Sequence, residues 1–358
     1  MIRLKSLLMS LAAVFLTLGL TSCDDNIIYE KEGDCTPKVQ FVFKKHRQAL
    51  HSVAGREADV FYSTVSSVHL FVFNKETDEL VLEKIEKTEN LHSASDLKIG
   101  SGTDKCYLPL DVKPGTYRLI AWCGLDETDH NNAFNLEDAT RAGKYTHMQF
   151  KRDEATNHPV HHAKYESVYH GAVEAVITVN SDGTQIIPVE LTKDNNDIAV
   201  WVQHTTQTFE DGEYEVVYVD ANGVVKFDDN ALDDDSRLEY HAHTTSLLDS
   251  ETEFNGDKVK SGALVAHLST SRLMAGNQHD ARLEVRHNDG RVVYSIPFIK
   301  YVLQMQTFTD NHQYYLDCED TYNCSFYLTG EKSEDGLWVP SRIIINNWVI
   351  VPSQNGKL

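Results

Sequence analysis

The amino-acid sequence predicts an all-β protein built from two tandem β-sandwich domains. Short runs of β-branched and aromatic residues recur about every ten positions, and turn residues separate them. Several runs are joined by dipeptides that favour a tight hairpin turn, because both residues tolerate a positive φ. These dipeptides are Asp182-Gly183, Asn222-Gly223 and Asp289-Gly290. Helix signals are sparse, and only one short helical turn is expected, after Pro297 at residues 299–305.

Four runs predict strands in the first half of the chain. Residues 39–43 (VQFVF) alternate in character, as in a strand with one buried face. Residues 68–73 (VHLFVF) are denser, which is typical of a strand covered on both faces. Residues 107–110 and 116–122 flank the turn residues Pro114-Gly115. These four runs are expected to build one sandwich.

The second half repeats this pattern. Residues 216–219 and 224–227 flank Asn222-Gly223, and residues 281–286 and 291–296 flank Asp289-Gly290. Residues 342–351 (RIIINNWVIV) form an amphipathic strand near the end of the chain. Such a strand is a candidate for pairing with a partner protein, because a sheet edge presents unpaired backbone groups. It would equally complete the second sandwich.

The length of the chain favours two domains. After removal of a leader, about 335 residues remain, more than one β-sandwich needs. The polar residues 192–197 (TKDNND) separate two strand-like runs and mark the boundary. We therefore predict a tether at residues 23–34, an N-terminal β-sandwich at 35–191 and a C-terminal β-sandwich at 197–350.

The N-terminus has the pattern of a bacterial lipoprotein signal peptide at residues 1–22. Arg3 and Lys5 precede an apolar run at residues 7–20, which ends just before Cys23. This run is shorter than the roughly 18 residues expected of a spanning helix. The pattern predicts cleavage before Cys23 and acylation of that cysteine, and two or three acyl chains anchor a protein stably in a membrane.

The charge excludes some partners. The chain has 33 basic and 54 acidic residues, a formal net charge of -21. Removal of the signal peptide would leave 31 basic and 54 acidic residues, and so a net charge of -23. Such a field repels nucleic acid and anionic lipid headgroups, so the sequence predicts no nucleic-acid partner and membrane contact only through the lipid on Cys23.

Five cysteines would remain after Cys23. In an exported protein they are candidates for disulfides, although an odd number leaves at least one thiol over. Cys318 and Cys324 flank a short polar segment between two strand-like runs, which suggests a cross-strand disulfide. Cys106 and Cys123 lie on either side of Pro114-Gly115 and would pair if their strands formed a hairpin. Cys35 is the fifth cysteine, and none of the spacings is that of a zinc site.

The sequence contains none of the common catalytic motifs, and no catalytic residue, cofactor or metal site is predicted. The cluster of His158, His161, His162 and His170 is not expected to bind a metal, because the segment 158–162 (HPVHH) has the character of a solvated loop. The acidic run 228–235 lacks the spacing of a calcium loop and is expected to be a solvated loop. Trp122, Trp201 and Trp348 lie in strand-like runs and are expected in the core. The protein is therefore predicted to be a binding or structural component rather than an enzyme.

Several segments resemble the FimB-type fimbrial anchor lipoproteins of Bacteroidetes. They occur in the family's order after Cys23, and their specificity lies in that succession. The segments are 34–43 (DCTPKVQFVF), 65–73 (VSSVHLFVF), 114–122 (PGTYRLIAW), 169–171 (YHG), 191–198 (LTKDNNDI) and 343–348 (IIINNW). The resemblance implies two transthyretin-like β-sandwich domains, lipid anchoring in the outer membrane, and contact with the first fimbrial shaft subunit. It also implies that the protein holds the fimbria at its base and limits its length.

Two alternatives stay open. Shaft and tip fimbrillins, which serve in adhesion, resemble proteins that an arginine-specific protease matures by removing the lipidated N-terminal strand. Arg47 and Arg56 lie in an expected exposed loop, where such a cut would make this chain a fimbrillin. The other alternative is a surface lipoprotein that binds glycans, which exposed aromatic platforms would favour. Asp24 and Asp25, just after Cys23, resemble the signal that sends such lipoproteins to the cell surface, or form a solvated acidic linker.

Overall fold

The computed structural model of this 358-residue chain describes residues 36–43, 61–125, 133–136, 147–153, 155–156, 158, 163–178, 185–205, 208–227, 237–254, 257–304 and 311–350. Several predicted features lie outside these residues: the signal peptide (1–22), Cys23, the tether (23–34), Cys35, Arg47, Arg56, the turn at Asp182-Gly183 and the acidic run 228–235. Within the described residues, no helix is long and apolar enough to cross a membrane.

The first body of the fold is a seven-stranded sheet with the order β3-β2-β5-β8-β9-β1-β4. Its strands are β1 (Lys38–Phe43), β2 (Ser67–Asn74), β3 (Leu80–Lys87), β4 (Tyr107–Pro109), β5 (Gly115–Cys123), β8 (Tyr169–Ile177) and β9 (Ile186–Lys193). The short helix α3 (Phe61–Thr64) precedes β2, and the 3-10 turn η1 (Thr88–Asn90) follows β3. β1 lies between β9, to which it is parallel, and β4, to which it is antiparallel.

Alternate residues of β2 belong to two different cores. Leu70 and Val72 pack with residues of β1, β5 and β9 in the core of the first body. Phe71 and Phe73 point the other way and pack, with Trp122 of β5, in a core that also contains most buried residues of the second body. The prediction that this dense apolar run is covered on both faces is therefore confirmed.

The second body contains a six-stranded sheet opposite a four-stranded one. The larger sheet has the order β14-β15-β10-β18-β19-β20, formed by β10 (Asn195–His204), β14 (Thr244–Phe254), β15 (Asp257–Ser271), β18 (Thr321–Lys332), β19 (Trp338–Ile345) and β20 (Trp348–Ile350). The smaller has the order β13-β11-β16-β17, formed by β11 (Tyr214–Asp220), β13 (Leu238–His241), β16 (Arg282–His287) and β17 (Val292–Ile296). Their buried faces share one hydrophobic core. The all-β sandwich prediction is therefore confirmed.

The helices of the second body are short. The 3-10 turn η2 (Ala275–Asn277) precedes β16, α4 (Phe298–Gln304) follows β17, and α5 (His312–Cys318) precedes β18. Helix α4 confirms the helical turn predicted after Pro297, and its residues Phe298, Ile299 and Val302 are buried in the core. Met305, at the end of that prediction, lies outside the described residues.

A third, three-stranded sheet links distant parts of the sequence. β6 (Phe134–Leu136) and β7 (His147–Phe150) precede the predicted boundary at 192–197, and β12 (Val224–Lys226), which pairs with β7, follows it. The hairpin predicted at Asn222-Gly223 is therefore wrong, since β11 pairs with β13 and β16 while β12 pairs with β7. The reason is that Asn222 is buried and its amide donates to the Ser271 and Arg272 carbonyls instead of facing solvent in a turn.

The turn at Asp289-Gly290 is as predicted. β16 and β17 are antiparallel neighbours, and Gly290 has a φ of 84°, which a residue with a side chain rarely adopts. By contrast, β4 and β5, which flank Pro114-Gly115, lie far apart in the sheet order and form no hairpin with each other. Long-range pairing with β1 places β4 at the far edge of the sheet.

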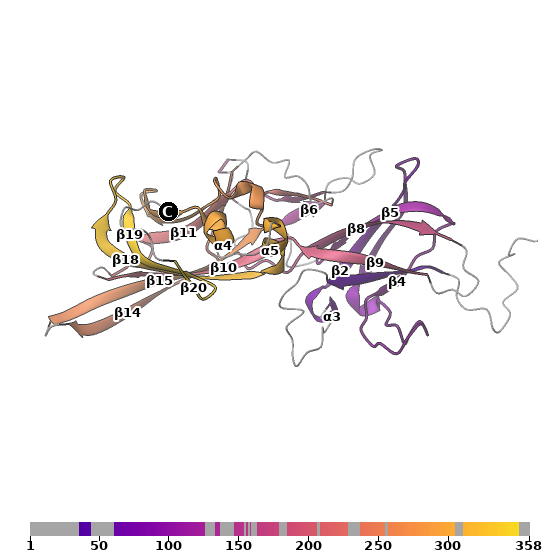
Figure 1. Cartoon of the computed structure of the whole chain (residues 1–358), viewed down its shortest axis with the longest axis horizontal. Helices are drawn as coiled ribbons and strands as arrows, with labels where there is room; N and C mark the ends of the chain where they lie inside the picture. The colour runs from indigo at the N-terminus through magenta and orange to yellow at the C-terminus, as the bar shows by residue number, and fades with distance from the viewer. Residues whose placement is uncertain are drawn as a thin grey trace, which may run out of the picture.

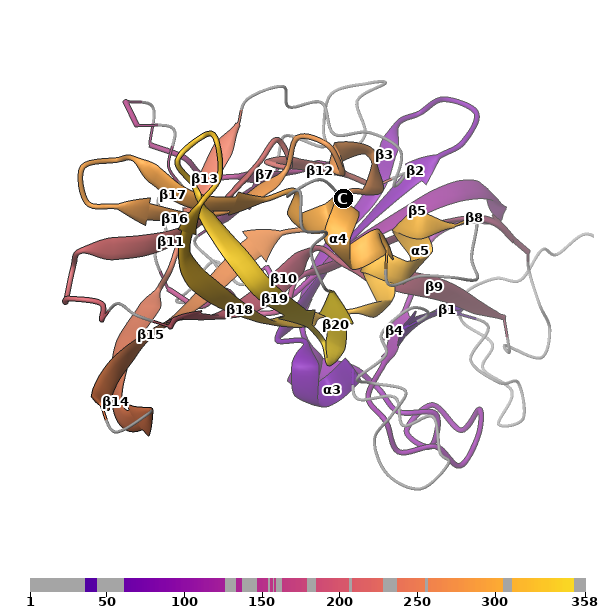
Figure 2. The same ribbon diagram turned by 60° about the vertical axis from the view of Figure 1, so that its left-hand side comes forward.

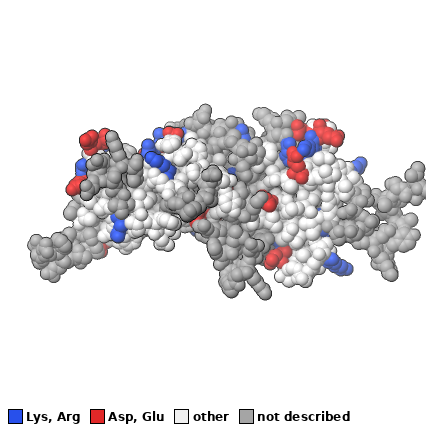
Figure 3. Space-filling model, in the orientation of Figure 1, with Lys and Arg blue, Asp and Glu red and all other residues white. Residues whose placement is uncertain are grey.

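Figure 1 shows the two bodies end to end along the long axis, with β9 and β10 passing from one to the other. In both Figure 1 and Figure 2 the hairpin of β14 and β15 projects from the end of the second body. In the view of Figure 3, acidic and basic side chains form small groups rather than a face of one sign.

Candidate functional site

The chain crosses between the two bodies in an almost continuous strand. β9 ends at Lys193 and β10 begins at Asn195, so only Asp194 lies between them. Asp194, Asn195 and Asn196 are all buried. The polar passage at residues 192–197 is therefore the centre of a packed joint.

Two asparagine side chains of this passage bind backbone groups of other segments. Asn195 Oδ1 accepts a hydrogen bond from the Val168 N–H (3.0 Å), and its Nδ2 donates to the Glu166 carbonyl (2.9 Å). Asn196 Nδ2 donates to the Glu319 carbonyl (2.8 Å), and its Oδ1 accepts from the Leu273 N–H (3.2 Å). Buried backbone groups need such partners, so these amides fix both bodies to the passage.

His170 belongs to the same joint. Its Nδ1 lies 2.7 Å from Asp194 Oδ1, and both side chains are almost completely buried. The ring of Trp122 packs against the His170 ring, with centroids 5.1 Å apart. His158 lies elsewhere, against Glu239, so the structure does not bring it together with His170. His161 and His162 lie outside the described residues.

A buried ion pair lies on the second body's side of the joint. Arg272 follows β15, and its Nε and one Nη donate to the two carboxylate oxygens of Asp317 on α5, each at 2.8 Å. Gln313 Nε2 also donates to Asp317 Oδ1 (2.9 Å). Bidentate pairing with a further donor is the arrangement in which two buried charges are tolerated. It fixes α5 to the end of β15.

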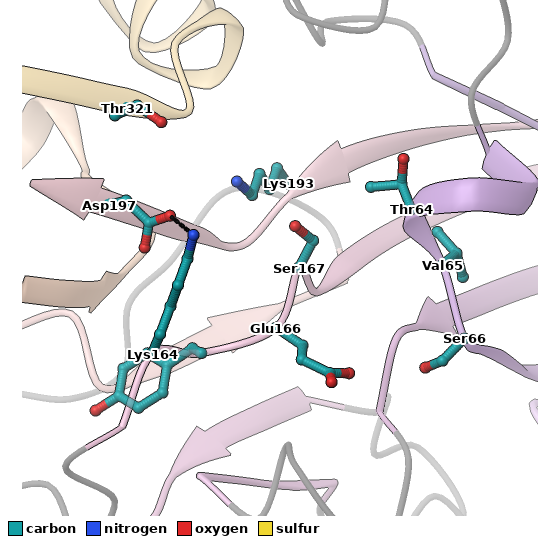
Figure 4. Close-up of a pocket in the computed structure, with 10 residues that line it drawn as sticks. Thr64, Val65, Ser66, Lys164, Glu166, Ser167, Lys193, Asp197 and Thr321 are labelled. Atoms are coloured by element: carbon teal, nitrogen blue, oxygen red, sulfur yellow. Dashed lines mark ion pairs between the residues drawn. The ribbon is translucent and has the colours of Figure 1, made fainter. Parts of the chain in front are cut away.

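A cleft of ≈ 660 Å³ opens beside the passage (Figure 4). Lys164 Nζ and Asp197 Oδ2 lie 3.4 Å apart in it. Its described lining is mainly polar and comes from the segments before β2 and β8, from the passage, and from the start of β18: Thr64, Val65, Ser66, Lys164, Tyr165, Glu166, Ser167, Lys193, Asp197 and Thr321. Two lysines and two acidic residues make this a mixed-charge surface that suits polar groups of either sign.

Asp320, buried next to the cleft, has a perturbed pKa. Burial raises the pKa of its carboxyl group to about 6, although the Lys193 ammonium group, 3.9 Å from Oδ1, favours the charged form. In the folded protein Asp320 therefore keeps its proton to a higher pH than it does in the unfolded chain, where the value is 3.8.

We predict a pH-dependent difference between the wild-type chain and Asp320→Asn. Between about pH 4 and pH 6 the folded state binds more protons at Asp320 than the unfolded state, so this group's contribution to stability falls as pH rises. The amide of the Asp320→Asn variant cannot ionise, so the stability of the variant lacks this decrease with pH. Its free energy of unfolding relative to wild type should rise by up to about 3 kcal/mol over this range, measured by urea denaturation at several pH values. Parallel pH profiles would contradict the assignment.

An apolar row crosses the outer face of the six-stranded sheet. Trp201 of β10 lies directly opposite Val265 of β15 and Ser325 of β18. Ser325 lies opposite Ile344 of β19, which lies opposite Val349 of β20. Directly opposed residues of a sheet point to the same face, and the residues that alternate with these along β10 and β15 are buried in the core. The row therefore faces away from the core.

The prediction that three tryptophans lie in the core is right only for Trp122, which is 0% exposed. Trp201 is 37% exposed and Trp348 is 55% exposed. Trp201 alternates with the buried Val200 and Val202, so a period of two places it on the opposite face. That alternation is visible in the sequence and is the signal by which the outer-face row can be found.

The single strand predicted at residues 342–351 is a hairpin. Asn346 and Asn347 have positive φ values of 45° and 71°, and they join β19 to β20. Asparagine tolerates this conformation better than most residues, which lets the chain reverse between two apolar runs. Among the described strands β20 is the last of its sheet, and Trp348 and Val349 are exposed on it.

The predicted disulfides are not present among the described residues. Cys324 is a free, buried thiol, so it is not bonded to Cys318; residues 312–318 form helix α5 rather than the strand that the prediction needs. Cys123 is likewise a free, buried thiol on β5, while Cys106 precedes β4 at the other end of the sheet order. Cys35 lies outside the described residues.

Two β-sheet bodies joined by a packed polar passage, with an apolar row on the outer face of the six-stranded sheet, define the architecture of this chain. The sequence matches the family described as fimbrillin-A associated anchor proteins Mfa1 and Mfa2, over residues 31–353. The chain belongs to this family of fimbrillin-associated anchor proteins, which places its role at fimbriae on the cell surface. No curated protein matches the sequence significantly.

Solved structures with the same fold support this architecture. A candidate adhesin from Bacteroides thetaiotaomicron is similar with a TM-score of 0.66 and 21% identity, over 89% of this chain and 99% of that one. A second protein of that organism, described as a candidate polysaccharide-binding protein, has a TM-score of 0.66 and 20% identity, over 90% and 100%. The fimbrial anchor protein Mfa2 from Porphyromonas gingivalis has a TM-score of 0.57 and 17% identity, over 88% and 99%. At these identities the likeness concerns the fold.

Proposed function

We propose that this chain is the lipid-anchored base of a fimbria and has no catalytic activity. In this proposal Cys23 bears the acyl chains that hold the protein in the outer membrane, at the cell surface. The first shaft subunit binds the second body, and this attachment fixes the fimbria and limits its length. The family membership and the signal-peptide pattern at residues 1–23 support the proposal.

The packing of β1 bears on whether the lipidated segment is kept. Val39 and Phe41 of β1 are completely buried, and β1 hydrogen-bonds to both β9 and β4. A cut after Arg47 or Arg56 would separate β1 and the lipid from the rest of the chain. An anchor needs both, so we propose that β1 stays covalently attached in the mature protein.

The proposed shaft contact rests on one observation, the exposed apolar row that ends at the edge strand β20. The row runs through Val265, Trp201, Ser325, Ile344 and Val349; Trp201 and Val349 are exposed, and Val265 and Ile344 are half-buried. An edge strand offers backbone groups to an incoming strand, and alternate apolar side chains then meet the partner. Aromatic residues are enriched at the centres of protein interfaces.

We predict that Val349→Lys weakens binding to the shaft subunit about tenfold or more, because a lysine ammonium group would have to lose water inside the interface. The matched control is Val176→Lys on β8 of the first body, since Val176 is 61% exposed and Val349 is 56% exposed. Surface plasmon resonance with purified shaft subunit gives both affinities. Equal affinities for the two variants would place the shaft contact elsewhere.

The proposed anchoring is tested by intact-mass and N-terminal analysis of the protein from sheared fimbriae and from outer membranes. An acylated start at Cys23, found at the membrane only, supports the base subunit. A start after Arg47 or Arg56 in protein distributed along sheared filaments would make this chain a polymerising or tip fimbrillin. Release of longer fimbriae into the medium by a Cys23→Ser strain would support the length-limiting role.

Glycan binding is the second candidate function, and the exposure of Trp201 favours it. Trp201 shares the outer face with Tyr327, but the Arg342 guanidinium group lies over the Tyr327 ring at 4.1 Å, so Trp201 is the aromatic face that is open to a ligand. Aromatic faces of this kind stack on sugars. A full-length acylated protein without any fimbrial association, whose binding to polysaccharide is lost in Trp201→Ala, would favour this function over the anchor.

A further inference from the structure

Three potential metal ligands converge where the first half of the chain meets β13. His158 lies on the connection between β7 and β8, and Glu239 and His241 lie on β13. His158 Nε2 is 3.0 Å from Glu239 Oε2, and His241 Nε2 is 3.7 Å from the same oxygen. One ligand atom from each of the three residues lies within 4.8 Å of the others.

These distances suit a metal ion of small radius. In a tetrahedral zinc site with bonds of about 2.0–2.1 Å, neighbouring ligand atoms are about 3.3 Å apart. The two measured separations, 3.0 Å and 3.7 Å, bracket that value, so small side-chain movements would complete the geometry. All three side chains are partly exposed, which leaves room for a water molecule as the fourth ligand.

His241 is oriented as a metal-binding histidine usually is. Its Nδ1 lies 3.1 Å from Glu215 Oε2 on β11, which favours the tautomer with the proton on Nδ1. Its Nε2 is then left with a lone pair, and this buried atom has no hydrogen-bond partner in the described part of the chain. A carboxylate behind the histidine and an unsatisfied nitrogen in front of it are two independent indications of a ligand.

Arg286 on β16 leaves the required oxygen of Glu239 available. Its guanidinium group donates to Glu239 Oε1 (2.9 Å) and to Glu284 Oε2, so only Glu239 Oε2 points at the two histidines. The carboxylates of Glu215, Glu239 and Glu284 outnumber the single guanidinium group of Arg286. The cluster therefore has an excess of acidic groups, which favours a divalent cation.

We propose that His158, Glu239 and His241 form a binding site for a divalent transition-metal ion, with Zn²⁺ as the ion that two imidazoles and a carboxylate suit best. The ion would tie the connection before β8 to β13 of the second body. That connection is already turned back at this point, since the Asp153 N–H donates to the His158 carbonyl (2.8 Å). The metal would therefore act as a cross-link and strengthen the attachment of this connection to the second body.

The test uses an untagged soluble chain that begins at residue 24, without the lipidated Cys23. The chain is freed of metal with a chelator and titrated with Zn²⁺ in a calorimeter. We expect one site per chain and a rise in the thermal midpoint on binding. His158→Gln and His241→Gln should each lower the affinity at least 100-fold, and Glu215→Gln, which acts through His241, about 10–100-fold. His243→Gln is the matched control on a half-buried histidine outside the cluster and should bind as wild type.

Co²⁺ in place of Zn²⁺ identifies the ligands by their visible spectrum. Tetrahedral bands without a thiolate charge-transfer band, lost in His158→Gln, would support the site; a thiolate band would assign the metal to cysteines and overturn it. The double variant His161→Gln/His162→Gln should bind Zn²⁺ as wild type does. If this variant lost Zn²⁺ binding while His158→Gln kept it, the proposal would also be overturned. An absence of stoichiometric binding would show that the three residues form a hydrogen-bonded cluster only. Because none of these measurements involves fimbriae, the outcome is independent of the proposed anchoring role.

Discussion

Replacing Asp317 with alanine should lower the free energy of unfolding by about 3–5 kcal/mol. The variant leaves the guanidinium group of Arg272 buried at the end of β15 without the carboxylate that accepts two of its hydrogen bonds. It also removes the acceptor of Gln313 Nε2. Urea denaturation followed by circular dichroism gives the free energies, and the m-value shows whether the compactness of either state has changed.

Two further variants separate burial from charge. Arg272→Met/Asp317→Leu removes both charges together and should restore most of the loss, because the desolvation cost disappears with them. Glu174→Ala breaks an exposed pair with Lys75 and Arg118 on the first body and should have little effect. If Asp317→Ala were as stable as Glu174→Ala, the buried pair would not fix α5 in the way inferred here.

Replacing Trp122 with alanine should also cost about 3–5 kcal/mol, since it removes a large, fully buried side chain. Trp122 is on β5 of the first body, but it packs in the core that contains most buried residues of the second body, and it also contacts His170 at the joint. The loss should therefore weaken the coupling between the bodies. Separate unfolding transitions, seen by calorimetry, would show that coupling directly.

The matched control is Trp201→Ala. Trp201 is also a strand tryptophan, but it lies on the outer face of β10 and is 37% exposed, so its removal should cost about 1 kcal/mol or less. A similar loss in both variants would contradict the placement of Trp201 on the outer face. A small loss for Trp122→Ala alone would show that the first body does not support the second through this side chain.

The all-β class could be predicted because it depends on local periodicity. The dense run at residues 68–73 is buried on both faces, and the turn at Gly290 needs a positive φ, as expected. Pairing over long distances could not be predicted in the same way. Asn222-Gly223 has the strongest local hairpin signal, but burial of Asn222 with the Ser271 and Arg272 carbonyls directs β12 to β7 instead.

The candidate sites show the same contrast between what a local pattern predicts and what long-range packing decides. Residues 192–197 stand out in the sequence as polar, and the structure shows why: Asn195 and Asn196 bind buried backbone groups of both bodies. The set of His158, Glu239 and His241 could not be found from spacing, since about eighty residues separate the first from the other two. Only the packing of the connection before β8 against β13 brings them together.

The sequence by itself determined the acidic character, the all-β class and the resemblance to fimbrial anchors, and it contains the pattern that predicts a lipoprotein signal at Cys23. Each of these features depends on short segments of the chain, and the composition or the period of two in those segments is enough to recognise it. The tertiary structure alone decided the sheet order, the burial of Cys123 and Cys324 on separate sheets, the exposure of Trp201 and Trp348, and the convergence of His158 with β13. Each of these depends on which distant strands pair, and that choice is made by burial of side chains over the whole chain rather than by any local pattern.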